Sequence, residues 1–264
     1  MTPMTPAAAP HRPAAVASAG DADAGARPEG PRESARRGAL VEGWEALRAA
    51  AGATGPVYGP SGHALEARPA TAARTSAEQA PEDPAGARVL RSLECAGARW
   101  TLLAAPPDVE PAPAGADWLL GVARLRLGVS EWLRDQAVAH LSARTSGGTP
   151  LVRMQLVLAA LADAAAAHLE AAVLLDVAPL SGAGAAPGGA EAASGPADAP
   201  PAVEPGQVRP TGFPGLDHVH HRITRADREL LRLFGASGFL SDGPGQRAHL
   251  SELLASMCLE GGNR

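Results

Sequence analysis

The sequence of 264 residues contains no lysine and few aromatic residues, and each shortage limits what the chain can be. All 23 basic residues are arginine, as expected from a GC-rich coding bias. They are scattered among 28 acidic residues, and no basic stripe alternates with aromatic residues, so we expect no nucleic-acid partner. With only four Trp, three Phe and one Tyr, the folded core must be built from less than the whole chain.

The chain is also poor in cysteine and in long hydrophobic runs. Cys95 and Cys258 lie far apart, with neither a Cys-x-x-Cys pair nor a histidine set beside them. This spacing indicates neither a disulfide framework nor a structural zinc site. The N-terminus has no compact apolar run typical of a signal peptide, and we expect no stretch of about 20 apolar residues to span a bilayer. The sequence therefore predicts a cytoplasmic protein with no membrane partner.

Three segments rich in Ala, Pro and Gly have too few large apolar side chains to offset the entropy of ordering them. They are residues 1–38, about 66–87 and about 179–214. We expect residues 1–38 to be a disordered tail. Residues 179–214 are predicted to be a flexible loop that joins two helices.

A small N-terminal region is predicted between residues 39 and 116. Residues 40–53 form a short helix in this interpretation, because Val41, Trp44 and Leu47 recur at helical spacing. Residues 89–104 alternate apolar and polar side chains around an Ala-Gly-Ala turn, which predicts a β-hairpin.

Residues 117–260 are predicted to be helical throughout, apart from the loop at 179–214. Four helices are expected, at residues 117–144, 151–176, 216–234 and 248–259. The inward face of the second is assigned to these residues: Leu151, Met154, Leu158, Leu161, Ala165 and Leu169. The fold class is therefore mainly α, an up-down four-helix bundle with a small helix and β-hairpin before it.

The corner between the first two of these helices brings a cation and an amide together. Arg144 closes one helix, Gly147 and Gly148 break it, and Pro150 is suited to open the next. Gln155 then lies in the first turns of that second helix. The planar fork of an arginine can hold phosphate oxygens with two hydrogen bonds and stays charged at any physiological pH.

These residues resemble the C-terminal helical domain of the acyl-CoA dehydrogenases. That family shows R-x-x-F-G-x-P-I-x-x-x-Q followed by L-A-D-M. Here the register from Arg144 to Gln155 and on to Asp163 is kept without a gap. The resemblance extends over residues 117–260 and implies the same bundle. It implies FAD as the cofactor, with Arg144 and Gln155 in contact with the FAD of a neighbouring subunit.

The same resemblance assigns roles to residues near the C-terminus. Gly235 and Gly238 correspond to the Q-x-x-G-G-x-G turn, whose backbone approaches the FAD in the family. Glu260 corresponds to the catalytic base of a terminal E-G motif, which takes the α-proton of an acyl thioester. The chain departs from the pattern at Arg232, which replaces the family's Gln, at Ala236, which replaces a Gly, and at Gly147, which replaces the Phe.

Each of these residues also has a purely structural interpretation. Arg144 can be a solvated charge at a helix end, and Gly235 can be a helix terminator. Glu260 can be a solvated residue near a frayed terminus. His218, His220 and His221 do not converge as three ligands from one helix, so we expect no metal site, and all three are assigned to a solvent-facing helix start.

Two functions are consistent with the sequence. The first is an acyl-CoA dehydrogenase-like flavoprotein, or a subunit of one, that carries out FAD-dependent α,β-dehydrogenation of an acyl thioester. The second is a non-catalytic helical dimerisation or regulatory module derived from that family. Residues 39–116 are too short for the family's N-terminal and middle β domains. We therefore expect a homo-oligomer, or a hetero-oligomer with a complete acyl-CoA dehydrogenase.

Overall fold

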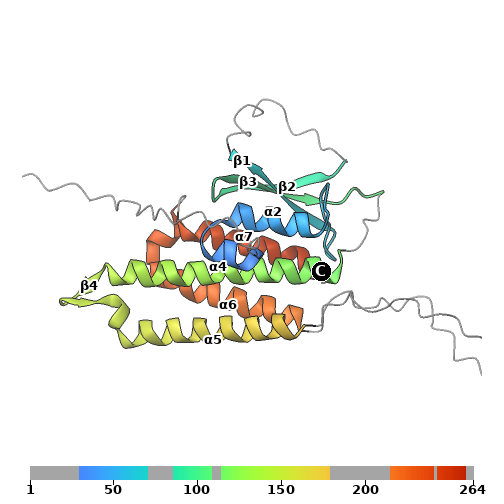
Figure 1. Cartoon of the computed structure of the whole chain (residues 1–264). Coiled ribbons are helices and arrows are strands. Elements are labelled where there is room, and N and C mark those ends of the chain that lie inside the picture. Colours follow the sequence, from blue (N-terminus) through green and yellow to red (C-terminus); the bar gives the residue numbers. More distant parts are fainter. Residues whose placement is uncertain (1–29, 71–85, 109–113, 179–214, 241–242, 260–264) are drawn as a thin grey trace, which may run out of the picture.

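The computed structural model describes residues 30–70, 86–108, 114–178, 215–240 and 243–259, and within them the chain is mainly helical with two small antiparallel sheets. A three-stranded sheet lies on one side of the helices, and α5 lies on the other (Figure 1). The helices contact one another chiefly through α4 (Ala116–Ser142), which packs against α1, α5, α6 and α7.

Helix α4 is the core element because its apolar positions recur around most of its circumference. The inward positions expected from the sequence are confirmed for Trp118, Val122, Leu125 and Val129, each at most 5% exposed. The helix ends at Ser142, two residues before the predicted end.

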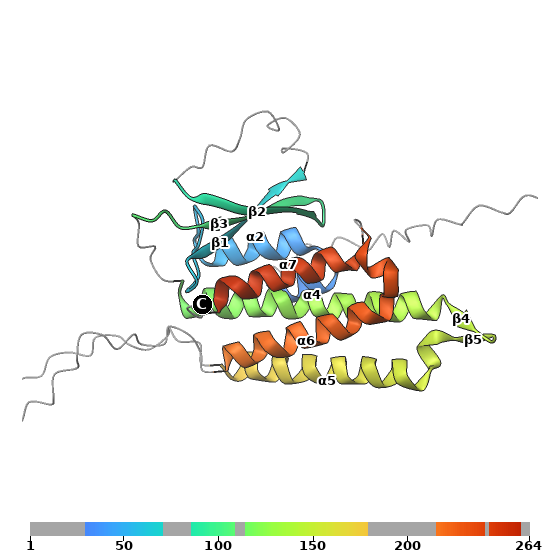
Figure 2. The same ribbon diagram turned by 180° about the vertical axis from the view of Figure 1, so that it is seen from behind.

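The remaining long helices follow the sequence closely. Helix α5 spans Gln155–Val177, α6 spans Leu216–Phe234, and α7 spans Pro244–Cys258. Helix α6 lies beside both α4 and α5, and α7 packs against α4 and α6 (Figure 2). Short 3-10 segments precede α5 at Leu151–Arg153 and follow α6 at Gly235–Phe239.

The predicted hairpin is present as β2 (Arg88–Cys95) and β3 (Ala98–Ala104). A third strand, β1 (His63–Pro69), pairs with the other side of β3, which gives the order β1-β3-β2. The sequence predicted that an unpacked segment begins at about residue 66. This boundary is wrong, because β1 continues to Pro69. Only Ala64 and Leu65 of β1 are buried, so the strand depends on its ladder with β3 and shows little apolar pattern of its own.

Three tryptophans join the sheet to the helices. Trp44 from α2 (Leu40–Ala50) packs edge-on against Trp100 of β3 and Trp118 of α4, with ring centroids 5.8 and 5.4 Å apart. Trp44 and Trp100 are 0% and 1% exposed. Three of the protein's four tryptophans thus lie at the junction between the sheet and the helices.

The assignment of residues 1–38 to a disordered tail is wrong for helix α1 (Pro31–Arg36). Arg32 donates two hydrogen bonds, of 3.1 and 2.7 Å, to the carboxylate of Glu131 on α4. Gly128 allows the close approach, because a Cβ there would meet the carbonyl oxygen of Arg32. These contacts are made with residues nearly a hundred positions away, so the local composition gave no sign of them.

The predicted inward face of α5 is also wrong. Leu158 and Leu169 are 51% and 67% exposed. The face that packs against α4 and α6 instead carries mostly alanine, namely Ala164, Ala167, Ala171 and Ala172, together with His168 and Leu175. A helix of Leu and Ala is apolar on every side, so its pattern does not show which side is covered.

By length and composition alone, α5 is apolar enough to cross a bilayer. Of the 18-residue apolar window of α5, 28% is buried inside the structure. The expectation that no such stretch exists is therefore wrong. The core helix of a soluble protein passes the same test.

Two predicted features lie outside the described residues. One is the flexible loop at 179–214, and the other is Glu260.

Candidate functional site

The predicted corner between α4 and α5 is a small hairpin. Strands β4 (Thr145–Ser146) and β5 (Thr149–Pro150) pair with each other, and the turn between them uses Gly147 and Gly148 at φ +57° and +80°. Positive φ is costly for residues with a Cβ, which explains the two glycines. Pro150 thus ends a strand and does not open α5.

Arg144 lies at the base of this hairpin. Its carbonyl accepts a hydrogen bond of 2.8 Å from the amide of Leu151, which ties the two sides of the corner together. Its side chain is exposed and has no ion-pair partner within the described part of the chain. The guanidinium is therefore available to an external anion.

Gln155 is the first residue of α5 and is also exposed. No side chain caps this helix start, so the amides of its first turn lack side-chain acceptors. Unpaired amides at a helix start favour an anion. Arg144 and Gln155 thus lie at the two ends of this corner, and both side chains are exposed.

His140 connects this corner to the turn after α6, and no local sequence pattern indicates this contact. Its ring lies 5.3 Å from the ring of Phe234, and Nε2 is 3.4 Å from Oγ of Ser237. Burial and then the charge of Arg144 lower the pKa of His140. His140 thus joins the end of α4, near the charge of Arg144, to the turn that follows α6.

The two glycines of that turn differ. Gly235 is exposed, ends α6 at φ +58° and ψ −141°, and has open space where a Cβ would point. Gly238 is buried, and a Cβ there would lie 3.1 Å from Cβ of Phe234. Gly235 therefore leaves room for a ligand, whereas Gly238 packs inside the turn.

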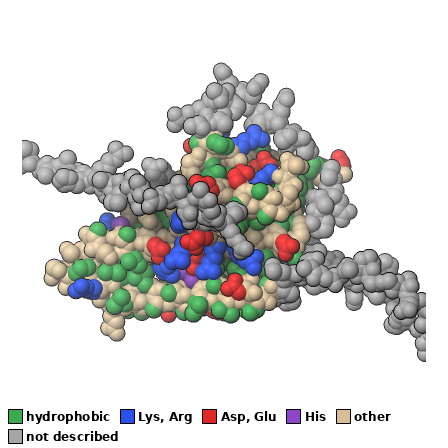
Figure 3. All heavy atoms as spheres, viewed as in Figure 1, with side chains coloured by type: hydrophobic (Ala, Val, Ile, Leu, Met, Phe, Trp, Pro, Cys, Tyr) green, Lys and Arg blue, Asp and Glu red, His purple; other side chains and the backbone are tan. Residues whose placement is uncertain are grey.

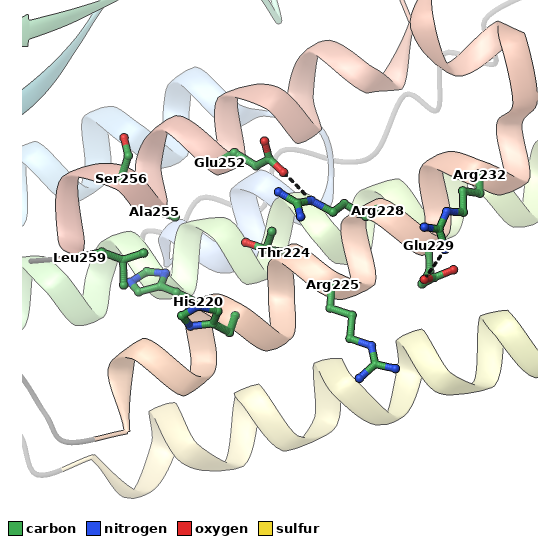
Figure 4. Close-up of a pocket in the computed structure, with 11 residues that line it drawn as sticks. His220, Thr224, Arg225, Arg228, Glu229, Arg232, Glu252, Ala255, Ser256 and Leu259 are labelled. Carbon is green, nitrogen blue, oxygen red and sulfur yellow. Dashed lines mark hydrogen bonds and ion pairs between the residues drawn. The ribbon is translucent and has the colours of Figure 1, made fainter. Parts of the chain in front are cut away.

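A cavity lies elsewhere, between α6 and α7, with a volume of about 570 Å³ (Figure 4). Arg228 and Arg232 on its wall form ion pairs with Glu252 and Glu229 at 3.0 and 2.6 Å. Arg225 points towards α5 (Figure 4). None of the predicted site residues lines this cavity, although Leu259, the residue before Glu260, does.

Arg126, which the sequence analysis did not single out, is fully buried next to this cavity. It donates hydrogen bonds to Nδ1 of His220 at 2.6 Å, to Thr224 at 2.9 Å and to Ser251 at 3.2 Å. Ser251 in turn donates to Asp227 at 3.0 Å. Burial raises the pKa of Asp227 to about 6, against the opposing effects of Ser130, Arg126 and Ser251.

The three neighbouring histidines have separate environments. His218 contacts Glu170 at 2.7 Å, and His221 contacts the carbonyl of Asp217. His220 is 1% exposed, so its assignment to a solvent-facing helix start is wrong. The described residues contain no group of three His, Cys, Asp or Glu that could hold a metal ion.

No family model and no curated protein matches the chain. Among solved structures, butyryl-CoA dehydrogenase from Megasphaera elsdenii is similar at 15% identity and a TM-score of 0.42, over 68% of this chain and 47% of that one. A glutaryl-CoA dehydrogenase from Mycobacterium smegmatis, solved with FADH2, is similar at 17% identity and a TM-score of 0.41, over 68% and 45% of the two chains. The chain spans about half the length of these structures.

The corner fits a flavin diphosphate as one side of a site. Arg144 and Gln155 supply exposed donors, and Gly235 leaves open space. Neither of the two cavities between the described helices includes Arg144, Gln155 or Gly235.

Proposed function

We propose that the protein is a cytoplasmic subunit of an acyl-CoA dehydrogenase-like flavoprotein, in which Arg144 and Gln155 bind the FAD diphosphate of a neighbouring subunit. The observation that carries the proposal is the pair of exposed donors at one corner, in the register of the family motif. A diphosphate dianion matches a guanidinium that stays charged at every physiological pH. The neighbouring subunit is a second copy or a complete acyl-CoA dehydrogenase. In this assignment the helices α4 to α7 are the family's four-helix bundle.

The same assignment gives Glu260 the role of base. Bound FAD would accept a hydride from the β-carbon of an acyl thioester, and the carboxylate of Glu260 would take the α-proton. Gly235 would let backbone and cofactor approach closely. In this assignment Gly238 contributes through its backbone to the shape of the turn.

A second candidate function is a helical dimerisation or regulatory module without catalysis. Two observations favour it. The exposed leucines of α5 indicate a surface for another chain. In the cavity between α6 and α7, two of the three arginines are already paired with glutamates. In this case the corner residues are solvated ends of helices.

Flavin binding separates the two functions. The full chain should be purified alone and after co-expression with a complete acyl-CoA dehydrogenase, and bound flavin measured from its visible absorbance. If the first function is right, Arg144→Ala abolishes flavin binding while the far-UV circular dichroism is unchanged. Arg153→Ala is the matched control, because Arg153 is an exposed arginine two residues before Gln155 and has no assigned role.

Two results would contradict the flavin proposal. One is a protein without flavin in both preparations. The other is an Arg144→Ala variant that retains as much flavin as the Arg153→Ala control.

A further inference from the structure

The outer face of α5 carries a continuous row of apolar side chains, which we call the α5 stripe. Its members are spaced three or four residues apart and are all exposed: Leu158, Ala162, Ala166, Leu169, Val173 and Val177. At 1.5 Å per residue the stripe is about 28 Å long. Apolar side chains gather along the lower edge of the molecule, where α5 lies (Figure 3).

The exposure of the stripe is unusual for a helix on the surface of an isolated molecule. Leu169, Val173 and Val177 are 67%, 52% and 65% exposed, whereas Ala164 and Ala171 on the opposite side are 3% and 0% exposed. Several large apolar side chains of α5 therefore face outwards, while most of its buried side chains are alanines. An apolar row of this length on a surface marks a contact with another molecule.

The order of large and small side chains along the stripe lets two antiparallel copies of the stripe fit together. When two copies of α5 run antiparallel, Leu158 lies opposite Val177 of the second copy. Ala162 then lies opposite Val173, and Ala166 opposite Leu169. Each alanine thus faces a larger side chain, which is the alternation that packs two helices closely. A parallel arrangement would place Ala162 against Ala162 and leave space between the helices.

The charges beside the stripe favour the same arrangement. A parallel pair would bring Asp163, Glu170 and Asp176 close to their own copies, which would repel one another. In the antiparallel pair these three acids lie level with alanines of the other copy, at positions 172, 165 and 159. The opposed helix dipoles also attract.

We propose that two copies of this chain associate through their α5 stripes, antiparallel, about a two-fold axis that lies between the two helices, level with residues 167 and 168. Such a contact is isologous, since both copies use the same surface and each facing pair of residues occurs twice. The proposal is independent of flavin binding, because it rests on α5 alone. It identifies the face of the molecule that would bring a second subunit to this chain.

The first test is the mass of the full chain in solution, measured by sedimentation equilibrium. The wild-type chain should be a dimer. Leu169→Arg places a charge near the two-fold axis and should raise the dimer dissociation constant at least about tenfold. Leu90→Arg on β2 is the matched control, because Leu90 is also an exposed leucine, and it should remain dimeric.

The second test establishes the orientation. Chains with Ala162→Cys and chains with Val173→Cys are mixed and treated with a short bis-maleimide. Covalent dimers should form between the two variants, and neither variant should cross-link to itself. Wild-type chains are the control, because both native cysteines are buried.

Several results would overturn the proposal. A monomeric wild-type chain would do so, whether it stays free or sediments with phospholipid vesicles. Self-cross-linking of Ala162→Cys would show a parallel pair. If Leu169→Arg does not fold, Leu169→Ser is used in its place. A Leu169→Ser variant that dimerises as tightly as wild type would exclude the α5 stripe as the dimer contact. Because flavin binding is measured in a separate experiment, a result that excludes the α5 contact does not change the result for flavin binding.

Discussion

Arg126 donates a hydrogen bond of 2.6 Å to Nδ1 of His220, and the two side chains are 0% and 1% exposed. Arginine has no acceptor, so Nδ1 of the histidine must accept and its hydrogen lies on Nε2. Burial is the main cause that lowers the pKa of His220 far below its ordinary range, followed by the charge of Arg126. The ring is therefore a neutral acceptor that helps to hold a buried cation between α4 and α6.

Replacement of Arg126 alone should lower the free energy of unfolding. Arg126→Met keeps much of the side-chain volume but leaves Asp227 buried without a nearby positive charge. We expect a loss of about 3–5 kcal/mol in the free energy of unfolding. Urea denaturation followed by circular dichroism measures it. A loss below about 1 kcal/mol would contradict this expectation.

Removal of both charges should be less harmful than removal of one. The double variant Arg126→Met/Asp227→Leu leaves no unpaired ion in the core, so it should recover a large part of the stability that Arg126→Met loses. The double-mutant cycle gives the coupling energy directly. If the two losses simply add, the charges of Arg126 and Asp227 do not stabilise each other.

The buried titratable groups predict how stability depends on pH. Burial lowers the pKa of His168 to about 4, and the pKa of His220 is lowered too, so both are neutral in the folded chain. The unfolded chain protonates both below about pH 6.5. Their contribution is present above that pH and is lost as the pH falls towards the folded pKa values.

Asp227 acts in the opposite direction. Because its folded pKa is raised to about 6, its contribution is present below the unfolded value near 3.8 and is lost as the pH rises through about 6. Counting these three groups alone, the unfolded chain therefore holds about one more proton than the folded chain between about pH 6 and pH 4.5. The free energy of unfolding should fall by about 1.4 kcal/mol per pH unit on acidification over this range.

Asp227→Asn tests this balance. An amide cannot take up a proton, so the histidines act unopposed and the fall should become about twice as steep. Urea midpoints at about pH 6 and about pH 4.5 give both slopes. A shallower slope in the variant would contradict the assignment of Asp227 as the opposing group.

The contact between α1 and α4 can be tested at Gly128. Gly128→Ala introduces a Cβ against the carbonyl oxygen of Arg32, so α1 must move and the chain should lose about 1–3 kcal/mol. Gly55→Ala is the control, because a Cβ at Gly55 has no neighbour within 4 Å. Equal stability of the two variants, measured by thermal denaturation, would show that α1 is not packed on α4.

Elements with strong local patterns were predictable. The residues of α6 were predicted at their observed limits, and the hairpin β2–β3 was found from its alternation and its turn. Elements held by distant partners were not. Helix α1 has only two buried residues, and its position depends on the ion pair of Arg32 with Glu131.

The candidate site was partly predictable for the same reason. The positions of Arg144 and Gln155 at the ends of two helices follow from the glycines between them. The approach of His140 to the turn at Gly235 could not be predicted, because the two segments are far apart in the sequence and meet only through the packing of α6 on α4.

The sequence by itself determined the four long helices, the hairpin and the corner that carries Arg144, because periodicity and turn residues act over a few neighbouring positions. The tertiary structure alone decided which side of α5 is buried, since a helix of Ala and Leu can pack on any side. It also decided that Arg126, His220 and Asp227 share one buried network. Burial and pairing depend on which distant segments arrive at the same place, and no local pattern encodes that.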